Sequence, residues 1–218
     1  MNKNEIQPAT IQLPADKQPQ NIDIHISQTG EGKQYGYVNH YEDHRKVAVV
    51  LPQMDDDEED NTPDGRIELD VSCYNLFVIA DELFRGKYFV VPKNQAIAVP
   101  RCTPEDLISL SYLSDNCQTV VKSFPAIFAS TNHGFARTDN SHMAFFGIIR
   151  RIQIKEDGIW IYFYKYRKLS QQILNEYADE FGIIGTEFKN ELDDTHWSIK
   201  RKNVIEALNK HGCPITLI

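Results

Sequence analysis

The sequence has no apolar run that approaches the roughly 18 residues a membrane-spanning helix needs. Its first 20 residues also lack a positively charged stretch followed by an apolar core, so they do not have the pattern of a secretory signal. We therefore expect a cytoplasmic protein with no membrane partner.

Motifs that would identify a reaction are missing as well. The four cysteines are widely spaced, with no Cys-x-x-Cys and no Cys/His spacing of the kind that zinc sites use. Neither a phosphate-binding glycine motif nor a Gly-x-Ser-x-Gly elbow is present. The sequence thus predicts free thiols in a reducing compartment, no cofactor and no metal, and it favours a protein that is not an enzyme.

Positive charge is scarce in the first third of the chain. Residues 1–70 contain 15 acidic and 6 basic residues, whereas residues 143–218 contain 10 acidic and 11 basic residues. The net charge of −8 therefore belongs to the N-terminal part. Such a separation of charge affects association and solubility more than it affects the fold.

The N-terminal part also divides the chain into regions. Residues 1–20 are rich in Gln, Asn and Pro and lack periodic apolar positions, so they are predicted to be a disordered tail. Residues 21–218 are predicted to form a single domain, with a possible boundary in the acidic loop 55–65. The six adjacent carboxylates at 55–60 lack the ligand spacing of a calcium-binding EF-hand and are interpreted as a solvated loop.

Apolar periodicity predicts an α+β fold: a mostly antiparallel sheet with about four helices packed on it, and a C-terminal β-hairpin followed by helices. The helices are expected at 76–84, from Thr103 as N-cap, at 170–181 with Leu169 as a staple, and at 203–211 with Asn203 opening a capping box. Short strands are expected at 22–26, 35–40, 47–51, 88–91, 96–99, 120–121, 126–129 and 197–200.

The most informative segment is 144–166, where two runs of apolar and aromatic residues flank the sequence Lys155-Glu156-Asp157-Gly158. An Asp-Gly pair between two such runs is typical of a β-hairpin, because glycine accepts the positive φ that a tight turn requires. The hairpin also carries the main cluster of cations in the chain. The residues predicted to bind a partner are Arg150, Arg151, Tyr164, Lys165, Arg167 and Lys168.

Two kinds of partner suit this hairpin. Aromatic rings beside cations are the components of protein interfaces, and we expect a non-catalytic binding or accessory protein with a protein partner. The alternative is a nucleic-acid-binding module, in which bases stack on the rings while Lys and Arg contact phosphates. A third interpretation is that one face of the hairpin is core and the other is ordinary solvated surface.

A separate polar loop at 130–142 gives the alternative of a hydrolytic enzyme. Its candidate catalytic residues are His133, Asp139 and His142, since a histidine beside a carboxylate can act as a general base at neutral pH. The pairs Asp139/His142 and Asp194/His196 are possible metal ligands, but a metal site needs three or four converging groups. Trp197 is expected to pin the loop before it to the core.

Overall fold

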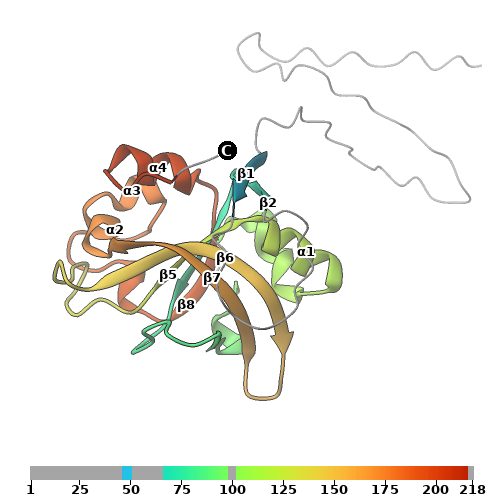
Figure 1. Cartoon of the computed structure of the whole chain (residues 1–218). Helices are drawn as coiled ribbons and strands as arrows, with labels where there is room; N and C mark the ends of the chain where they lie inside the picture. Colours follow the sequence, from blue (N-terminus) through green and yellow to red (C-terminus); the bar gives the residue numbers. More distant parts are fainter. Residues whose placement is uncertain (1–45, 51–65, 98–101, 216–218) are drawn as a thin grey trace, which may run out of the picture. The chain divides into compact units, whose positions relative to one another are not determined.

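The computed structural model describes residues 46–50, 66–97 and 102–215, which lie in one unit, Arg45–Ile218. Strands and helices both occur, as the sequence predicted (Figure 1). The predicted tail at 1–20, the strands at 22–26 and 35–40 and the acidic run at 55–60 lie outside the described residues. The strands are β1 Lys46–Val50, β2 Arg66–Asp70, β3 Tyr74–Val78, β4 Tyr88–Val91, β5 Pro125–Ala129, β6 Met143–Ile154, β7 Ile159–Ser170 and β8 His196–Lys200. The helices are α1 Asp115–Ser123, α2 Gln172–Glu176, α3 Ala178–Phe181 and α4 Val204–Lys210, with 3-10 turns η3 Lys93–Gln95, η4 Glu105–Tyr112 and η5 Glu191–Asp193.

Six strands form one curled sheet in the order β4-β7-β6-β5-β3-β8. Neighbouring strands are antiparallel except β3 and β5, which are parallel. The chain after β4 crosses to the opposite edge, where Ala96 pairs with Trp197 of β8 and the Ile97 amide donates to the Trp197 carbonyl at 2.7 Å. Through this short pairing, the segment that follows β4 lies beside β8. At Trp197, the backbone of β8 is therefore paired with β3 on one side and with Ala96 on the other.

The inner face of the curled sheet is filled with aromatic rings. Phe77 of β3 stacks on Phe128 of β5 and on Trp197 of β8, with ring centroids 5.6 and 4.9 Å apart. Trp197 is fully buried and its indole nitrogen donates to Asn75, which confirms that it anchors the end of the preceding loop. Val121 of α1 and half-buried leucines of η4 pack against the same cluster.

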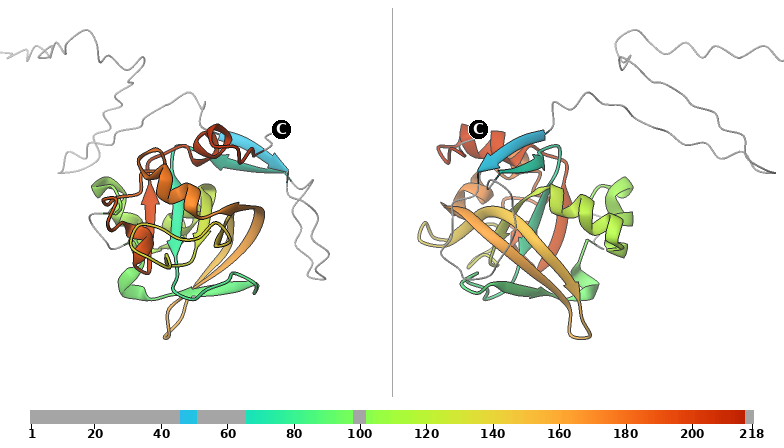
Figure 2. Two further views of the ribbon diagram at one scale, coloured as in Figure 1. Left: turned by 90° about the vertical axis from the view of Figure 1, so that its left-hand side faces the viewer. Right: turned by 45° about the vertical axis from the view of Figure 1, so that its right-hand side comes forward.

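The opposite face is covered by α2, α3 and α4, while α1 lies on the other side of the sheet (Figures 1 and 2). Leu174 of α2, Phe181 of α3 and Leu208 of α4 are fully buried against this face. Helix α4 begins where the sequence predicted, because the Asn203 side chain accepts from the Glu206 amide at 3.2 Å and satisfies one exposed donor of the first turn.

Strands β1 and β2 form a separate antiparallel ribbon. Leu69 of β2 is fully buried beside Ile148 of β6, and half-buried side chains of β1, β2 and β7 complete this third cluster. The ribbon therefore covers part of the outer surface of the β6–β7 hairpin, which bears on what that hairpin can bind.

Several predicted elements differ from the structure. The helix expected at 76–84 is wrong: Leu76 and Phe77 belong to β3, whose residues are all buried because both faces of the sheet are covered. The strand expected at 120–121 is part of α1. Thr103 does not cap a helix, since its hydroxyl accepts from the Ile199 amide.

The helix expected at 170–181 is also wrong as drawn. Leu169 and Ser170 are the last residues of β7, so Leu169 does not act as a helix staple, and the chain then forms the two short helices α2 and α3. Tyr177, which lies between these two helices, is 40% exposed and stacks on His211. No described helix is long and apolar enough to cross a membrane.

Candidate functional site

The predicted β-hairpin is confirmed, and each strand is twelve residues long. Its turn closes where the Lys155 amide donates to the Gly158 carbonyl at 2.9 Å. Gly158 has φ of +155°, and a Cβ there would lie 2.5 Å from Val90 of the neighbouring β4. Glycine is therefore required by both backbone conformation and space. In Figures 1 and 2 the turn projects beyond the neighbouring strands.

The outer face of the hairpin near this turn carries a set of stacked side chains that we call the hairpin strip. Trp160 stacks on Tyr88 of β4 at 4.1 Å between ring centroids, and Tyr88 lies against Tyr162 at 5.4 Å. Lys155 lies 3.2 Å from the centre of the Trp160 ring, and Arg151 lies 4.1 Å from that of Tyr162. The hairpin strip comprises Tyr88, Arg151, Lys155, Trp160 and Tyr162.

The structure divides the predicted binding residues among different surroundings. Arg151 belongs to the hairpin strip and is exposed. Arg167 and Lys168 are exposed, but they pair with Phe146 and Phe145 near the opposite end of the hairpin. At about 3.3 Å per residue, this places them on the order of 15 Å from Arg151 along the strands. The six predicted residues therefore do not form one continuous cluster.

Three of the predicted residues make internal contacts. The Lys165 ammonium donates to the Phe84 carbonyl at 2.7 Å and lies 4.8 Å from the Phe145 ring. Tyr164 is half-buried beside Leu69 in the cluster under the β1–β2 ribbon, and Arg150 lies 5.5 Å from the Tyr164 ring. The side chains of Arg150, Tyr164 and Lys165 therefore contribute contacts to the fold itself.

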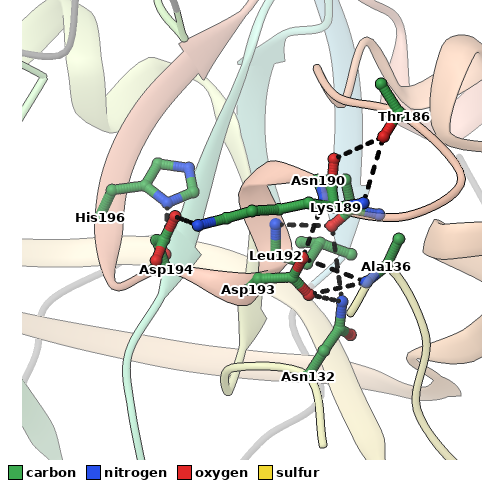
Figure 3. A network of polar contacts seen from close by, with 9 residues as sticks. All are labelled: Asn132, Ala136, Thr186, Lys189, Asn190, Leu192, Asp193, Asp194 and His196. Atoms are coloured by element: carbon green, nitrogen blue, oxygen red, sulfur yellow. Dashed lines mark hydrogen bonds and ion pairs between the residues drawn. The ribbon is translucent and has the colours of Figure 1, made fainter. Parts of the chain in front are cut away.

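A network of polar side chains fixes the candidate catalytic loop to the rest of the fold (Figure 3). The Asp193 carboxylate accepts from the backbone amides of Ala136 and Asn190 and from the Asn132 side chain, at 2.8 to 3.1 Å. Asn132 also exchanges two hydrogen bonds with Asn175 of α2, at 3.0 and 2.9 Å. The side-chain amides of Asn132 and Asn175 are therefore hydrogen-bonded to partners that are themselves half-buried, and these bonds hold the loop in place.

The structure brings the three candidate catalytic residues together in this loop. His133 Nδ1 lies 2.8 Å from Asp139 Oδ2, and the rings of His133 and His142 are 4.2 Å apart. The Ser141 hydroxyl donates to Asp139, not to a histidine, so the Ser-His-Asp relay of a hydrolase is not formed. His133 and Asp139 are more than half exposed.

The pKa values of Asp139 and His142 are both lowered by their surroundings in the loop. The hydrogen bond from Ser141, and then that from His133, hold the pKa of Asp139 well below its usual range. Partial burial, followed by the proximity of His133, lowers the pKa of His142. At neutral pH these lowered pKa values favour an ionised Asp139 and a neutral His142.

A second group of ionisable side chains, missed by the sequence analysis, lies inside the fold. The Lys200 ammonium is 2.5 and 2.6 Å from the two carboxylate oxygens of Glu191, and it donates to the Cys102 carbonyl at 2.8 Å. His196 Nε2 is 3.2 Å from Glu191 Oε2. The side chains of Glu191, His196 and Lys200 are each no more than 5% exposed.

Glu191 is ionised despite its burial. Burial raises its pKa, but the contact with His196 and the positive charge of Lys200 together outweigh burial and leave the pKa below its usual value. The pair Asp194/His196 does not bring a carboxylate to the imidazole. The Asp194 backbone carbonyl contacts His196 Nδ1, and the Asp194 carboxylate pairs with Lys189. The carboxylate that lies beside His196 is that of Glu191.

The chain matches no protein-family model, no curated protein and no solved structure. Its function therefore has to be inferred from the residues and their geometry alone.

Proposed function

We propose that the protein is a non-catalytic binding protein of the cytoplasm that contacts a protein partner through the hairpin strip. The observation that carries this proposal is the continuous contact of the Trp160, Tyr88 and Tyr162 rings with one another and with two cations on the outer face of the hairpin. Trp, Tyr and Arg are the residue types that most often dominate the binding energy of protein interfaces.

Preorganisation supports the same proposal. The Trp160 indole donates to the Asp157 carboxylate at 3.0 Å, and its ring is stacked on Tyr88. Side chains that are already ordered lose less entropy on association than mobile ones. Arg151 and Lys155 are exposed and add positive charge beside the rings, so an acidic surface is the complementary partner.

The nucleic-acid alternative is less well supported by this geometry. Lys155 lies 3.2 Å from the centre of the Trp160 ring, and the nearly parallel Tyr88 ring lies 4.1 Å away. Two groups this close cannot occupy the same side of one ring, so they cover both faces of Trp160. A base needs an open ring face on which to stack. The hairpin strip therefore favours a protein partner over single-stranded nucleic acid.

The hydrolase alternative also receives limited support. His133 and Asp139 are paired, but Ser141 is bonded to the carboxylate and offers no activated nucleophile. Two cavities in the described part of the chain, of about 230 and 430 Å³, are not lined by His133, Asp139 or Ser141. The side chains of His133 and Asp139 are more than half exposed, and such a pair is poorly suited to exclude water from a reaction.

Charge reversal on the hairpin strip tests the proposal. The variant Arg151→Glu with Lys155→Glu should reduce recovery of co-purifying or cross-linked protein at least tenfold. The matched control, Arg137→Glu with Lys202→Glu, makes the same change in net charge at two exposed positions on other parts of the chain and should retain the partner. Thermal stability should change little in both, because exposed charges contribute at most about 1 kcal/mol each to folding.

Other outcomes of this experiment separate the alternatives. If the Arg151→Glu/Lys155→Glu variant instead loses a bound nucleic acid that the parent retains, the partner is nucleic acid and not protein. Absorbance at 260 nm and a steep fall of affinity with rising salt would identify it. Equal recovery of every partner by the parent and both variants would refute a binding role for the hairpin strip. Lys165→Glu is unsuitable for this test, since Lys165 donates to the Phe84 carbonyl inside the fold.

A further inference from the structure

Three potential metal ligands from distant parts of the chain meet in the interior. Cys102 precedes η4, Glu191 begins η5 and His196 begins β8. One donor atom from each lies within 4.8 Å of the others, and all three residues are buried. In the part of the chain that the structure describes, no other group of three such side chains converges this closely. We propose that Cys102, Glu191 and His196 form a zinc-binding site.

The orientation of His196 is that of a metal ligand. Its Nδ1 lies 2.8 Å from the Asp194 carbonyl, which can only accept a hydrogen bond, so Nδ1 carries the proton. In the neutral imidazole the other nitrogen, Nε2, then presents a lone pair to the interior. Fixing one imidazole nitrogen by a backbone carbonyl is how proteins commonly orient histidine toward a metal.

That lone pair lacks a suitable hydrogen-bond partner. His196 Nε2 is buried and is 3.2 Å from Glu191 Oε2, but the two atoms are not aligned for a hydrogen bond. In the neutral imidazole, two electron-rich atoms face each other in a medium of low dielectric constant, which is unfavourable unless Nε2 carries a proton or a metal ion. A cation coordinated by both atoms removes this cost.

The donor set selects zinc among the common divalent ions. One thiolate sulfur, one imidazole nitrogen and one carboxylate oxygen are the ligands that Zn²⁺ uses, whereas Mg²⁺ and Ca²⁺ prefer oxygen alone. Bonds of about 2.0 to 2.3 Å in a tetrahedron put ligand atoms roughly 3.5 Å apart, so the group would contract by about 1 Å on binding. A small rotation of buried side chains provides such a change.

Three protein ligands leave a fourth coordination position, as in zinc sites that bind water. Cys102 and Lys200 also line a cavity of about 230 Å³, which offers a route to that position. Lys200 can keep its contact of 2.5 Å with Oε1 while Oε2 turns to the metal. Because the Cys102 thiol must lose its proton, binding should release protons and should weaken as the pH falls.

Cobalt substitution tests the site on the full chain. After removal of metal with a chelator, Co²⁺ is titrated in a non-thiol reductant. We expect one Co²⁺ per chain, a thiolate-to-cobalt absorption band in the near ultraviolet, the strong visible absorption of tetrahedral cobalt, and displacement of both by Zn²⁺. Cys102→Ala should abolish the thiolate band, whereas the matched variant of another buried cysteine, Cys213→Ala, should retain it.

Affinity gives a second measure. Cys102→Ala should weaken Zn²⁺ binding more than about 100-fold in competition with a chromogenic chelator, because loss of an outer partner alone costs 10 to 100-fold. The parent chain decides the question even if a variant does not fold: absence of a thiolate-to-cobalt band overturns the site. The same band at equal intensity in Cys102→Ala would assign the metal to another cysteine and would also overturn it.

Discussion

The buried pair of Glu191 and Lys200 provides the sharpest test of how the interior is held together. Both side chains are 3% exposed, and the ammonium has the Cys102 carbonyl as its remaining hydrogen-bond partner. The substitution Glu191→Gln keeps the shape but removes the compensating negative charge. A buried charge left without its partner costs about 3 to 5 kcal/mol of unfolding free energy, a large share of the roughly 5 to 15 kcal/mol that a protein has.

Urea denaturation at pH 7 in the presence of a chelator measures this loss. The double variant Glu191→Gln with Lys200→Met removes both charges and should recover most of the stability, because the cost arises from the unpaired ammonium. Lys189→Gln is the matched control: its ion pair with Asp194 spans 3.2 Å but is more than half exposed. Its loss should cost at most about 1 kcal/mol.

The pH dependence provides an independent check on the same pair. The pKa of Glu191 is lower in the folded protein than its usual value of about 4.5. The unfolded chain therefore takes up this proton first, and the parent loses stability as the pH falls below about 4.5. Glu191→Gln should lack this part of the acid sensitivity. Equal losses from Glu191→Gln and Lys189→Gln, or no recovery in the double variant, would refute the reasoning.

Three further predictions concern the helices, the polar loop and the hairpin turn. Leu174→Ala should lower the unfolding free energy by about 2 to 5 kcal/mol, whereas the exposed Asp179→Ala should cost far less; similar small losses would contradict the packing of α2. Because the pKa of His142 is lowered in the folded protein, the unfolded chain binds this proton first, and stability should fall as the pH drops below about 6.5. His142→Asn should reduce this fall, as measured by urea midpoints between pH 7 and 5. An unchanged dependence of the midpoint on pH would contradict this prediction. Gly158→Ala should cost about 1 to 3 kcal/mol in the same assay, because of its positive φ and the contact with Val90; a neutral effect would mean that the turn relaxes.

Elements with strong local signals were predictable from the sequence. The hairpin was predictable because an Asp-Gly turn between two aromatic runs allows few other structures. The start of α4 was also predictable, since Asn203 satisfies a backbone amide three residues later in the chain. The bonded pair of His133 and Asp139 formed within one loop, where sequence proximity already favours contact.

Elements whose pattern depends on distant neighbours were not predictable. The helix expected at 76–84 followed from apolar residues at helical spacing, but this stretch begins inside β3, where every residue is buried because a layer packs on each face of the sheet. The covering of Tyr164 by the β1–β2 ribbon likewise depends on a contact between segments far apart in the sequence.

The sequence by itself determined the hairpin, its turn and the kinds of side chain displayed on it, because these follow from interactions between near neighbours. Only the tertiary structure decided which of its cations share a surface with stacked rings, since bulges and covering elements assign each residue to a face. The same is true of the interior group, in which Cys102 meets Glu191 and His196 across about 90 residues of chain. Such long-range contacts have no local signature, because the curl of the sheet creates them.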